Sequence, residues 1–252
     1  MPAAYDTYDY PSYWIGRDYE HKSEVWAMQS LLSRIAKIKT ILEVGSGFGR
    51  LTPTYAFRSK KVILSDPSSK LLKIARETFK NRKNFKFIHA SLETLPEKVR
   101  SGSVDLVVLV RVIHHLQDLP ASFKTINRLL KPNGYFILEF ANKANWKATI
   151  RHILRGDFTF PLDIFPTDLR SKKSIKKNSI PFFNYHPYKI KEILKDNGFE
   201  IIEIKSVSNI RSSTLKTIFS TDILVSLEKL LQPLFTLFYF GPSIFILAQK
   251  RG

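Results

Sequence analysis

The sequence predicts an α/β protein with a doubly wound, mostly parallel sheet and helices on both faces. Strand and helix patterns alternate from residue 40 to residue 140. A glycine-rich turn, Gly45 to Gly49, follows the first apolar strand, and the run Val104–Val110 is almost entirely apolar. Such a strand is expected in the middle of a parallel sheet, where both faces are buried. Parallel strands joined through helices then require right-handed crossovers.

The first half of the chain should supply five strands and the helices between them. Apolar residues at helical spacing predict a helix over Val25–Ile38. Ser68 can cap a later helix, and Pro132 with Gly134 ends another. The elements expected from the first strand onward are strand Thr40–Val44, helix Leu51–Arg58, strand Lys61–Leu64, a helix from Ser68 to Lys80, strands Phe85–His89 and Val104–Val110, helix Leu119–Leu130 and strand Tyr135–Phe140.

The second half should add two strands and helical insertions. Its expected elements are an irregular stretch 141–186, helix Pro187–Asn197, strand Phe199–Val207, mostly helix over Ser212–Tyr239, and strand Ser243–Gln249. The long helical part carries an apolar stripe, which we expect to pack against the sheet edge or the first insertion. The alternative is an apolar cap over a substrate or a surface that rests on a membrane. The stripe consists of Leu215, Ile218, Phe219, Ile223, Leu227, Leu230, Leu231, Leu234 and Phe238.

Composition limits the kinds of site. None of the 252 residues is cysteine, which excludes disulfides, thiolate metal sites and a cysteine nucleophile, and we expect no metal. With 40 Lys and Arg against 22 Asp and Glu, the net charge of +18 can attract anionic partners. The basic residues are scattered, however, which favours ordinary solvated faces. Their one dense cluster is Arg170–Lys177.

The two ends of the chain bear on its location. The N-terminal residues lack the basic and apolar regions of a signal peptide. The apolar run Leu234–Ala248 has 15 residues and is cut by Gly241-Pro242, whereas a spanning helix needs about 20. We therefore expect a cytoplasmic protein, monomeric or weakly dimeric, with membrane contact that is peripheral if it occurs.

The glycine-rich turn is the first candidate site. Ligands of such sheets bind outside the carboxyl ends of the strands. Gly45 and Gly47 let a ligand approach the backbone, and the helix expected after them would favour a carboxylate or phosphate. Asp66 closes the second strand, where an acid can hydrogen-bond the two ribose hydroxyls of an adenosine. Its alternative role is to cap the helix that begins near Ser68.

Five motifs in this order resemble those of the class I S-adenosylmethionine-dependent methyltransferases, a Rossmann-like family. The similar segments are E-V-G-S-G-F-G (43–49), L-S-D (64–66), F-I-H-A-S-L-E-T-L-P (87–96), V-D-L-V-V-L-V-R-V-I-H-H-L (104–116) and L-L-K-P-N-G-Y (129–135). The resemblance covers roughly residues 25–143 and the last helix and two strands. It implies a seven-stranded sheet with an antiparallel last strand and helical insertions after strands five and six.

The resemblance also implies an enzyme that binds S-adenosylmethionine. Glu43 would support the glycine loop, Asp66 would hold the ribose, and Leu92 would lie near the adenine. Ser91 stands where the family often has Asp, so hydrogen bonding to the adenine amino group should be weaker or come from elsewhere. The implied cofactor-binding set is Glu43, Gly45, Ser46, Gly47, Asp66, Pro67, Ser91, Leu92, Arg111 and Arg17.

Two histidines after the fourth strand are candidates for a catalytic base. His114 and His115 should face the pocket, where neutral imidazole can take a proton from an O or N acceptor at pH 7. Alternatively, they only shape the pocket wall. Arg111 stands where the cofactor methionine or the acceptor could be met. Arg17 could pair with the cofactor carboxylate from a segment that closes over the cofactor.

We expect a single domain over residues 1–252. It comprises an N-terminal lid and helix (1–39), a cofactor-binding core (40–143) and two acceptor-side insertions (144–186 and 209–242). Since both insertions leave the carboxyl ends of strands, they should border the acceptor. The predicted reaction is methyl transfer to an O, N or C nucleophile of a small, hydrophobic or lipid-like molecule.

Three other functions remain open at the level of sequence. The charge suggests an RNA-directed methyltransferase or an RNA-binding protein, whose nucleic-acid affinity would fall with salt. Against it, no RNA-binding motif is appended, and Arg111-Val112-Ile113-His114 stands in place of the Asp/Asn-Pro-Pro-aromatic motif of many amino-group methyltransferases. A nicotinamide oxidoreductase is disfavoured by the glycine spacing. A catalytically silent subunit that only binds the cofactor is the last alternative.

Overall fold

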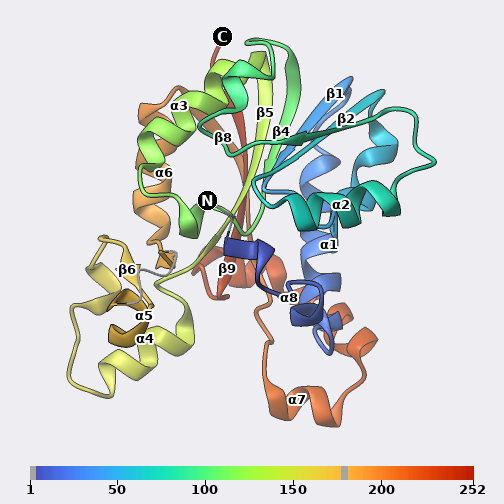
Figure 1. Cartoon of the computed structure of the whole chain (residues 1–252). Helices are drawn as coiled ribbons and strands as arrows, with labels where there is room; N and C mark the ends of the chain where they lie inside the picture. The colour runs from blue at the N-terminus through green and yellow to red at the C-terminus, as the bar shows by residue number, and fades with distance from the viewer. Residues whose placement is uncertain (1–3, 177–180) are drawn as a thin grey trace.

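The computed structural model describes residues 4–176 and 181–252 and contains the expected seven-stranded sheet (Figure 1). The strand order is β3-β2-β1-β4-β5-β9-β8. All neighbours are parallel except β9, which runs antiparallel to β5 and β8. The strands are β1 Thr40–Val44, β2 Lys61–Asp66, β3 Phe85–His89, β4 Val104–Leu109, β5 Leu130–Ala141, β8 Phe199–Val207 and β9 Ser243–Lys250. The predicted fold class and antiparallel last strand are confirmed.

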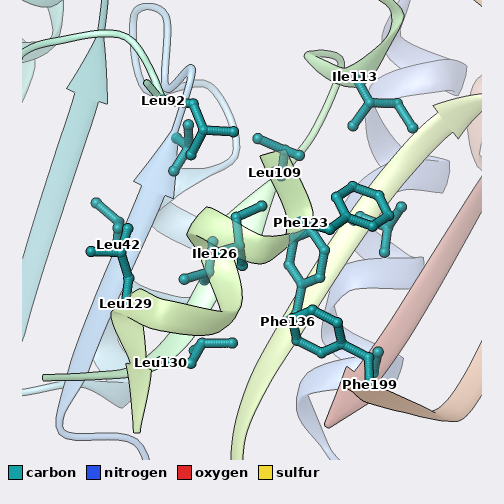
Figure 2. Packing of buried hydrophobic residues seen from close by; sticks show 14 of the residues in the cluster. Leu42, Leu92, Leu109, Ile113, Phe123, Ile126, Leu129, Leu130, Phe136 and Phe199 are labelled. Carbon is teal, nitrogen blue, oxygen red and sulfur yellow. The ribbon is translucent and has the colours of Figure 1, made fainter. Parts of the chain in front are cut away.

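Helices cover both faces of this sheet, as Figure 1 shows. Helices α3 and α6 pack on one face, whereas α1, α2 and α8 lie on the other. Figure 2 shows part of the first core, where Phe123, Phe136 and Phe199 meet between α3 and the sheet. The helices are α1 Asp18–Leu32, α2 Ser69–Thr78, α3 Leu119–Leu129, α4 Trp146–Ile153, α5 Lys172–Lys176, α6 Pro187–Asp196, α7 Ser213–Ile218 and α8 Thr221–Leu237.

The parallel register brings three chain segments to one edge of the sheet. Val44 at the end of β1 pairs with Ser65 of β2, and Glu43 pairs with Val108 of β4. The glycine loop, Asp66 and the turn after β4 therefore meet outside the carboxyl ends of these strands. Ser68 caps α2 as expected, because its hydroxyl accepts a hydrogen bond from the Leu71 amide at 3.2 Å.

The helix predicted over Leu51–Arg58 is absent. The chain forms two short 3₁₀ turns instead, Thr52–Thr54 and Ala56–Arg58. Pro53 has no amide hydrogen to continue a helical ladder. The hydroxyls of Thr52 and Tyr55 both donate to the buried Glu43 carboxylate, which holds this segment in tight turns. The glycine loop is thus not followed by a long helix whose dipole could favour an anion.

Other elements also differ from expectation. Strand β5 begins at Leu130 rather than Tyr135, so Pro132 and Gly134 lie within this strand instead of ending the preceding helix. Helix α1 covers residues 18–32 rather than 25–38, although Ile35 and Ile38 beyond its end are still buried. The stretch predicted to be irregular contains α4, α5 and a small antiparallel pair, β6 Thr167–Asp168 with β7 Phe183–Asn184. Within the basic cluster 170–177, Lys177 lies outside the described residues.

The apolar stripe of the second insertion does not pack as predicted. Ile218, Leu230 and Phe238 expose 65%, 74% and 70% of their surface. Helix α8 instead buries a face that includes Glu228 and Gln232. The Glu228 carboxylate faces inward because the Tyr19 hydroxyl donates to it at 2.7 Å and the side chain of Asn209 at 2.8 Å. Polar anchoring therefore sets the rotation of α8 and leaves much of the stripe exposed.

Candidate active site

The glycine loop is braced by Asp66. Gly45 and Gly47 have φ values of +67° and +55°, in the left-handed region that favours glycine. A Cβ on Gly45 would lie 2.3 Å from Val112 Cγ2. The Asp66 carboxylate accepts from the Gly47 amide and the Ser68 amide, both at 2.7 Å. Burial raises the pKa of Asp66, although these two amide donors oppose the increase.

Glu43 does not line the small cavity and instead holds the two turns that follow the glycine loop. Its carboxylate is buried and receives the Thr52 hydroxyl at 2.7 Å and the Tyr55 hydroxyl. Burial raises the pKa of Glu43 to about 7, although both hydroxyl donors oppose this. Ser46 is also set back from the cavity. Its Oγ is buried and has no hydrogen-bond partner among the described residues.

A cavity of about 200 Å³ lies at the loop. It brings together most of the residues singled out from the sequence, and it adds two tyrosines from the N-terminal segment. The singled-out residues on its wall are Gly45, Gly47, Asp66, Pro67, Ser91, Leu92, Arg111 and His115, and the added tyrosines are Tyr5 and Tyr10. Glu43, Ser46, His114 and Arg17 do not line it.

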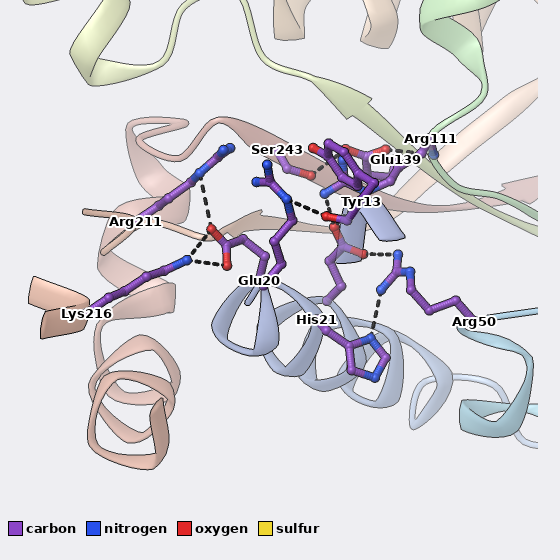
Figure 3. Close-up of polar contacts among 11 residues, drawn as sticks. Tyr13, Glu20, His21, Arg50, Arg111, Glu139, Arg211, Lys216 and Ser243 are labelled. Carbon is purple, nitrogen blue, oxygen red and sulfur yellow. Dashed lines mark hydrogen bonds and ion pairs between the residues drawn. The ribbon is translucent and has the colours of Figure 1, made fainter. Parts of the chain in front are cut away.

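Arg111 belongs to a buried ionic network that is drawn in Figure 3. Its guanidinium and that of Arg50 both bind the carboxylate of Glu24, which is fully buried. Trp14 stacks against both guanidinium groups, with the ring centroid 3.4 Å from Arg50 Cζ and 4.7 Å from Arg111 Cζ. Arg111 has a φ of +58°, and its amide donates to the Glu139 carboxylate at 2.8 Å. A non-glycine residue held in this region marks a candidate functional site.

Sequence reasoning missed Glu24 and Glu139, although both leave a signal. Glu24 lies one helical turn before Ala27 and Met28, on the stripe of α1 that is buried. Glu139 interrupts an apolar strand. A carboxylate in such a position requires a buried partner, because an unpaired buried charge is costly. Nothing local identifies that partner, which for Glu24 is Arg111, 87 residues away.

Arg17 does not reach the small cavity. Its Nε donates to the Tyr13 carbonyl at 2.7 Å, and its guanidinium lies 4.1 Å from the Tyr13 ring centroid. It lines a larger, neighbouring cavity of about 790 Å³. The expected pairing of Arg17 with a ligand in the small cavity is therefore not supported. Residues from both insertions line the larger cavity, including Arg151 and Arg211.

The two histidines have different surroundings. His115 Nδ1 lies 2.7 Å from the Pro181 carbonyl, and its Nε2 lies 2.7 Å from the Tyr5 hydroxyl. Since a carbonyl only accepts hydrogen bonds, Nδ1 carries the proton and Nε2 has a lone pair toward the cavity. Burial lowers the pKa of His115, which keeps it neutral. His114 is buried against Phe182, and burial lowers its pKa strongly.

Comparison with known proteins agrees with this geometry. Residues 42–138 match the methyltransferase domain family. A ubiquinone/menaquinone biosynthesis C-methyltransferase from Pseudoalteromonas translucida is 26% identical over 194 residues, which cover 70% of this chain and 72% of that protein. A non-reducing polyketide synthase from Penicillium roqueforti is 28% identical over 145 residues, which cover 52% of this chain. The chain spans only 6% of that synthase's length.

A solved structure confirms the fold. The S-adenosylmethionine-dependent methyltransferase from Mesorhizobium loti superposes with a TM-score of 0.63 at 16% identity, over 90% of this chain and 98% of that one. The sheet, the glycine loop and the acid that ends β2 define a Rossmann-like domain for an adenosine-containing cofactor. Residues 42–138 are thus similar to the methyltransferase domain family, and the whole chain has the fold of a solved S-adenosylmethionine-dependent methyltransferase. These similarities agree with the family, the enzyme class and the cofactor that the sequence predicts.

The chemistry of the small cavity fits S-adenosylmethionine. Each Asp66 oxygen accepts one amide and keeps a lone pair for a ribose hydroxyl. Ligand pockets usually exceed about 300 Å³, and this cavity is smaller because Tyr5 and Tyr10 reach into it. The N-terminal segment thus borders the space that the cofactor would occupy.

Proposed function

We propose that this protein transfers a methyl group from S-adenosylmethionine to an O, N or C nucleophile of a small, hydrophobic or lipid-like acceptor. The observation that carries this proposal is the Asp66 carboxylate bound to the Gly47 amide beside a cavity at the strand ends. The names of two relatives, which concern a quinone and a polyketide, support a small organic acceptor. The exposed apolar surface of the second insertion supports a hydrophobic one.

In this proposal each residue of the small cavity contacts a different part of the cofactor. The cofactor supplies an activated methyl sulfonium, so the protein mainly aligns the acceptor with the methyl group. In this proposal Gly45 and Gly47 admit the cofactor close to the backbone, and Asp66 binds the ribose. Leu92 forms the apolar wall near the adenine, and Arg111 meets the methionine end. Pro67 and Ser91 complete the wall on the adenosine side.

His115 is proposed as the general base for an O or N acceptor. Its Nε2 lone pair is bound by the hydroxyl of Tyr5, a residue of the N-terminal segment that lines the same cavity. The bond from Nδ1 to the Pro181 carbonyl would hold the ring in this tautomer during proton transfer. His114 has no comparable position and serves packing in this proposal.

Calorimetric titration with S-adenosylhomocysteine tests the cofactor assignment. We expect wild-type protein to bind it, and Asp66→Ala to weaken binding by more than about 1 kcal/mol, because charged hydrogen bonds to the ribose are lost. Asp105→Ala is the matched control. Asp105 lies at the opposite edge of the sheet, where it accepts hydrogen bonds from the Thr40 amide and Lys131 Nζ. An unchanged dissociation constant for Asp66→Ala would contradict the assignment.

A vesicle experiment tests contact with a membrane surface. No helix among the described residues is long and apolar enough to cross a bilayer. Leu154 and Leu162 of the first insertion are each about 80% exposed, and exposed lysines of α5 follow them in the chain. We expect sedimentation with vesicles of anionic phospholipid but not of phosphatidylcholine. Replacing Lys172, Lys173 and Lys176 with Gln should reduce partitioning, by about 1 kcal/mol per lysine near the surface. Equal binding to both vesicle types would contradict this expectation.

A further inference from the structure

The larger cavity carries more positive than negative charge. It lies between the two insertions and has a volume of about 790 Å³, which suits a small organic molecule. Six basic and three acidic side chains line it, an excess of three positive charges. The basic ones are Arg17, Lys143, Lys147, Arg151, Arg211 and Lys216, and the acidic ones are Glu20, Asp157 and Asp163. A cleft with such an excess concentrates anions.

The acidic residues do not satisfy all of these cations. Lys143 binds Asp163 at 2.6 Å, and Lys216 binds Glu20 at 2.6 Å. Arg211 pairs with Glu20 through Nε, at 3.3 Å, and Figure 3 shows it on the same side of Glu20 as Lys216. Its terminal nitrogens donate no hydrogen bond within residues 4–176 and 181–252.

The guanidinium groups of Arg17 and Arg151 also have N–H donors without an acceptor in the described residues. Among the described residues, Arg17 donates a hydrogen bond only through Nε, to the Tyr13 carbonyl. The Arg151 guanidinium has no hydrogen bond or ion pair with any part of the chain that the structure describes. Three arginines on one cavity wall thus present terminal N–H groups without acceptors. Arginine forks of this kind match carboxylate and phosphate oxygens, which they bind in pairs.

A stack of side chains lies between the larger cavity and the small cavity, which is the proposed cofactor site. Tyr10 lines the cofactor cavity and stacks on Tyr13, with ring centroids 5.9 Å apart. The Arg17 guanidinium packs over the ring of Tyr13, and Arg17 lines the larger cavity. The same N-terminal segment therefore forms the wall between the two cavities. This segment separates a molecule in the larger cavity from the small cavity, so methyl transfer between the two would require the segment to shift.

We propose that the larger cavity is the acceptor site and that it selects acceptors with an anionic group, a carboxylate or a phosphate, bound by Arg151, Arg211 and Arg17. This inference rests on the proposed methyltransferase function and specifies its substrate class. The apolar side chains on the same wall, Trp146, Phe160 and Leu169, contact the organic part of the acceptor. The charged group anchors one end of the molecule and leaves the nucleophile free to approach the cofactor.

Calorimetric titration with a series of matched probes tests the inference. The probes are octanoate, octyl phosphate, octanol and octylamine, each added to protein saturated with S-adenosylhomocysteine. They share one apolar chain and differ in the head group. We expect one or both anions to bind at least about tenfold more tightly than octanol or octylamine, as charged hydrogen bonds imply. Comparison of octanoate with octyl phosphate shows which anion the arginines prefer.

Two arginine variants supply the control, one on α4 and one in the turn that follows it. Arg151→Gln should weaken binding of the anions about tenfold. Arg155→Gln removes the same charge four residues later, outside the larger cavity, and should leave binding unchanged. Neither residue is buried, and α4 buries no side chain, so both variants should fold.

The outcomes separate this inference from the proposed function. If wild-type protein binds S-adenosylhomocysteine but no anion in preference to octanol, the acceptor class is wrong and the methyltransferase function stands. Equal losses in Arg151→Gln and Arg155→Gln would show a general charge effect and overturn the site. If S-adenosylhomocysteine does not bind, the proposed function fails first, and the inference fails with it.

Discussion

Glu24→Ala should lower the free energy of unfolding by about 3–5 kcal/mol, the usual cost of removing one partner from a buried ion pair. Glu24 is fully buried, and its side chain is shared by Arg50 and Arg111, whose side chains are only 12% and 24% exposed. Burial opposes ionisation of Glu24, but the two arginines outweigh it and hold its pKa below the usual value. Without the carboxylate, two guanidinium groups remain beneath the cofactor cavity with little water to compensate them.

Urea unfolding of the two proteins measures this loss, and Glu20→Ala provides a comparison on the same helix. Glu20 is also buried, but its partners Arg211 and Lys216 are 46% and 27% exposed and can turn toward solvent. Its removal should therefore cost less than that of Glu24. If the two variants lose the same stability, the loss reflects the cavity left by removing a glutamate from α1. It would then not reflect the two arginines left without a carboxylate partner.

The sequence predicts the sheet well because each strand carries its own signal. Strands β3 and β8 have the predicted bounds, and the apolar run of β4 lies near the middle of the sheet as its composition requires. The cap of α2 is equally local, since Ser68 and Leu71 are three residues apart. Patterns of this kind depend only on neighbours in the chain, so one sequence is enough to read them.

Features that depend on distant partners could not be predicted in the same way. The rotation of α8 is set by Glu228, whose partner Tyr19 lies 209 residues earlier. The pattern of apolar residues alone predicts that the opposite face of α8 is buried. The segment after the glycine loop has helical spacing, but the buried carboxylate of Glu43 draws Thr52 and Tyr55 into turns. In both cases a buried carboxylate outweighs the apolar pattern because its hydrogen bonds must be satisfied inside the protein.

The candidate site likewise has parts that the sequence predicts and parts that depend on distant residues. Gly45, Gly47 and Asp66 meet because they end adjacent parallel strands, which topology alone requires. Arg17 was expected at the same cavity from its place in an N-terminal segment, and the structure assigns it to the neighbouring one. Which of the two histidines faces the cavity also depended on the contact of His115 with Pro181, in the other half of the chain.

His115→Gln should lower kcat by about 10²–10⁴-fold with any O or N acceptor that the wild-type enzyme methylates, the range for loss of a general base. His114→Gln should affect kcat much less, because His114 does not line the cofactor cavity. Binding of S-adenosylhomocysteine should be retained in His115→Gln, which separates loss of the base from loss of the site. A kcat close to that of wild type would exclude His115 as the base.

The pH dependence gives an independent test of the same group. Burial lowers the pKa of His115 below its ordinary value of 6.5, although the Pro181 carbonyl opposes this. The neutral form, which carries the Nε2 lone pair, should therefore persist to a lower pH than in a free histidine. We expect the fall in activity on acidification to occur at a lower pH than an ordinary histidine would give. Nitrogen NMR of the imidazole should show Nδ1 protonated at pH 7, because the Pro181 carbonyl can only accept. An Nε2–H tautomer would leave no lone pair toward the acceptor, and proton transfer to His115 would then be impossible without turning the ring.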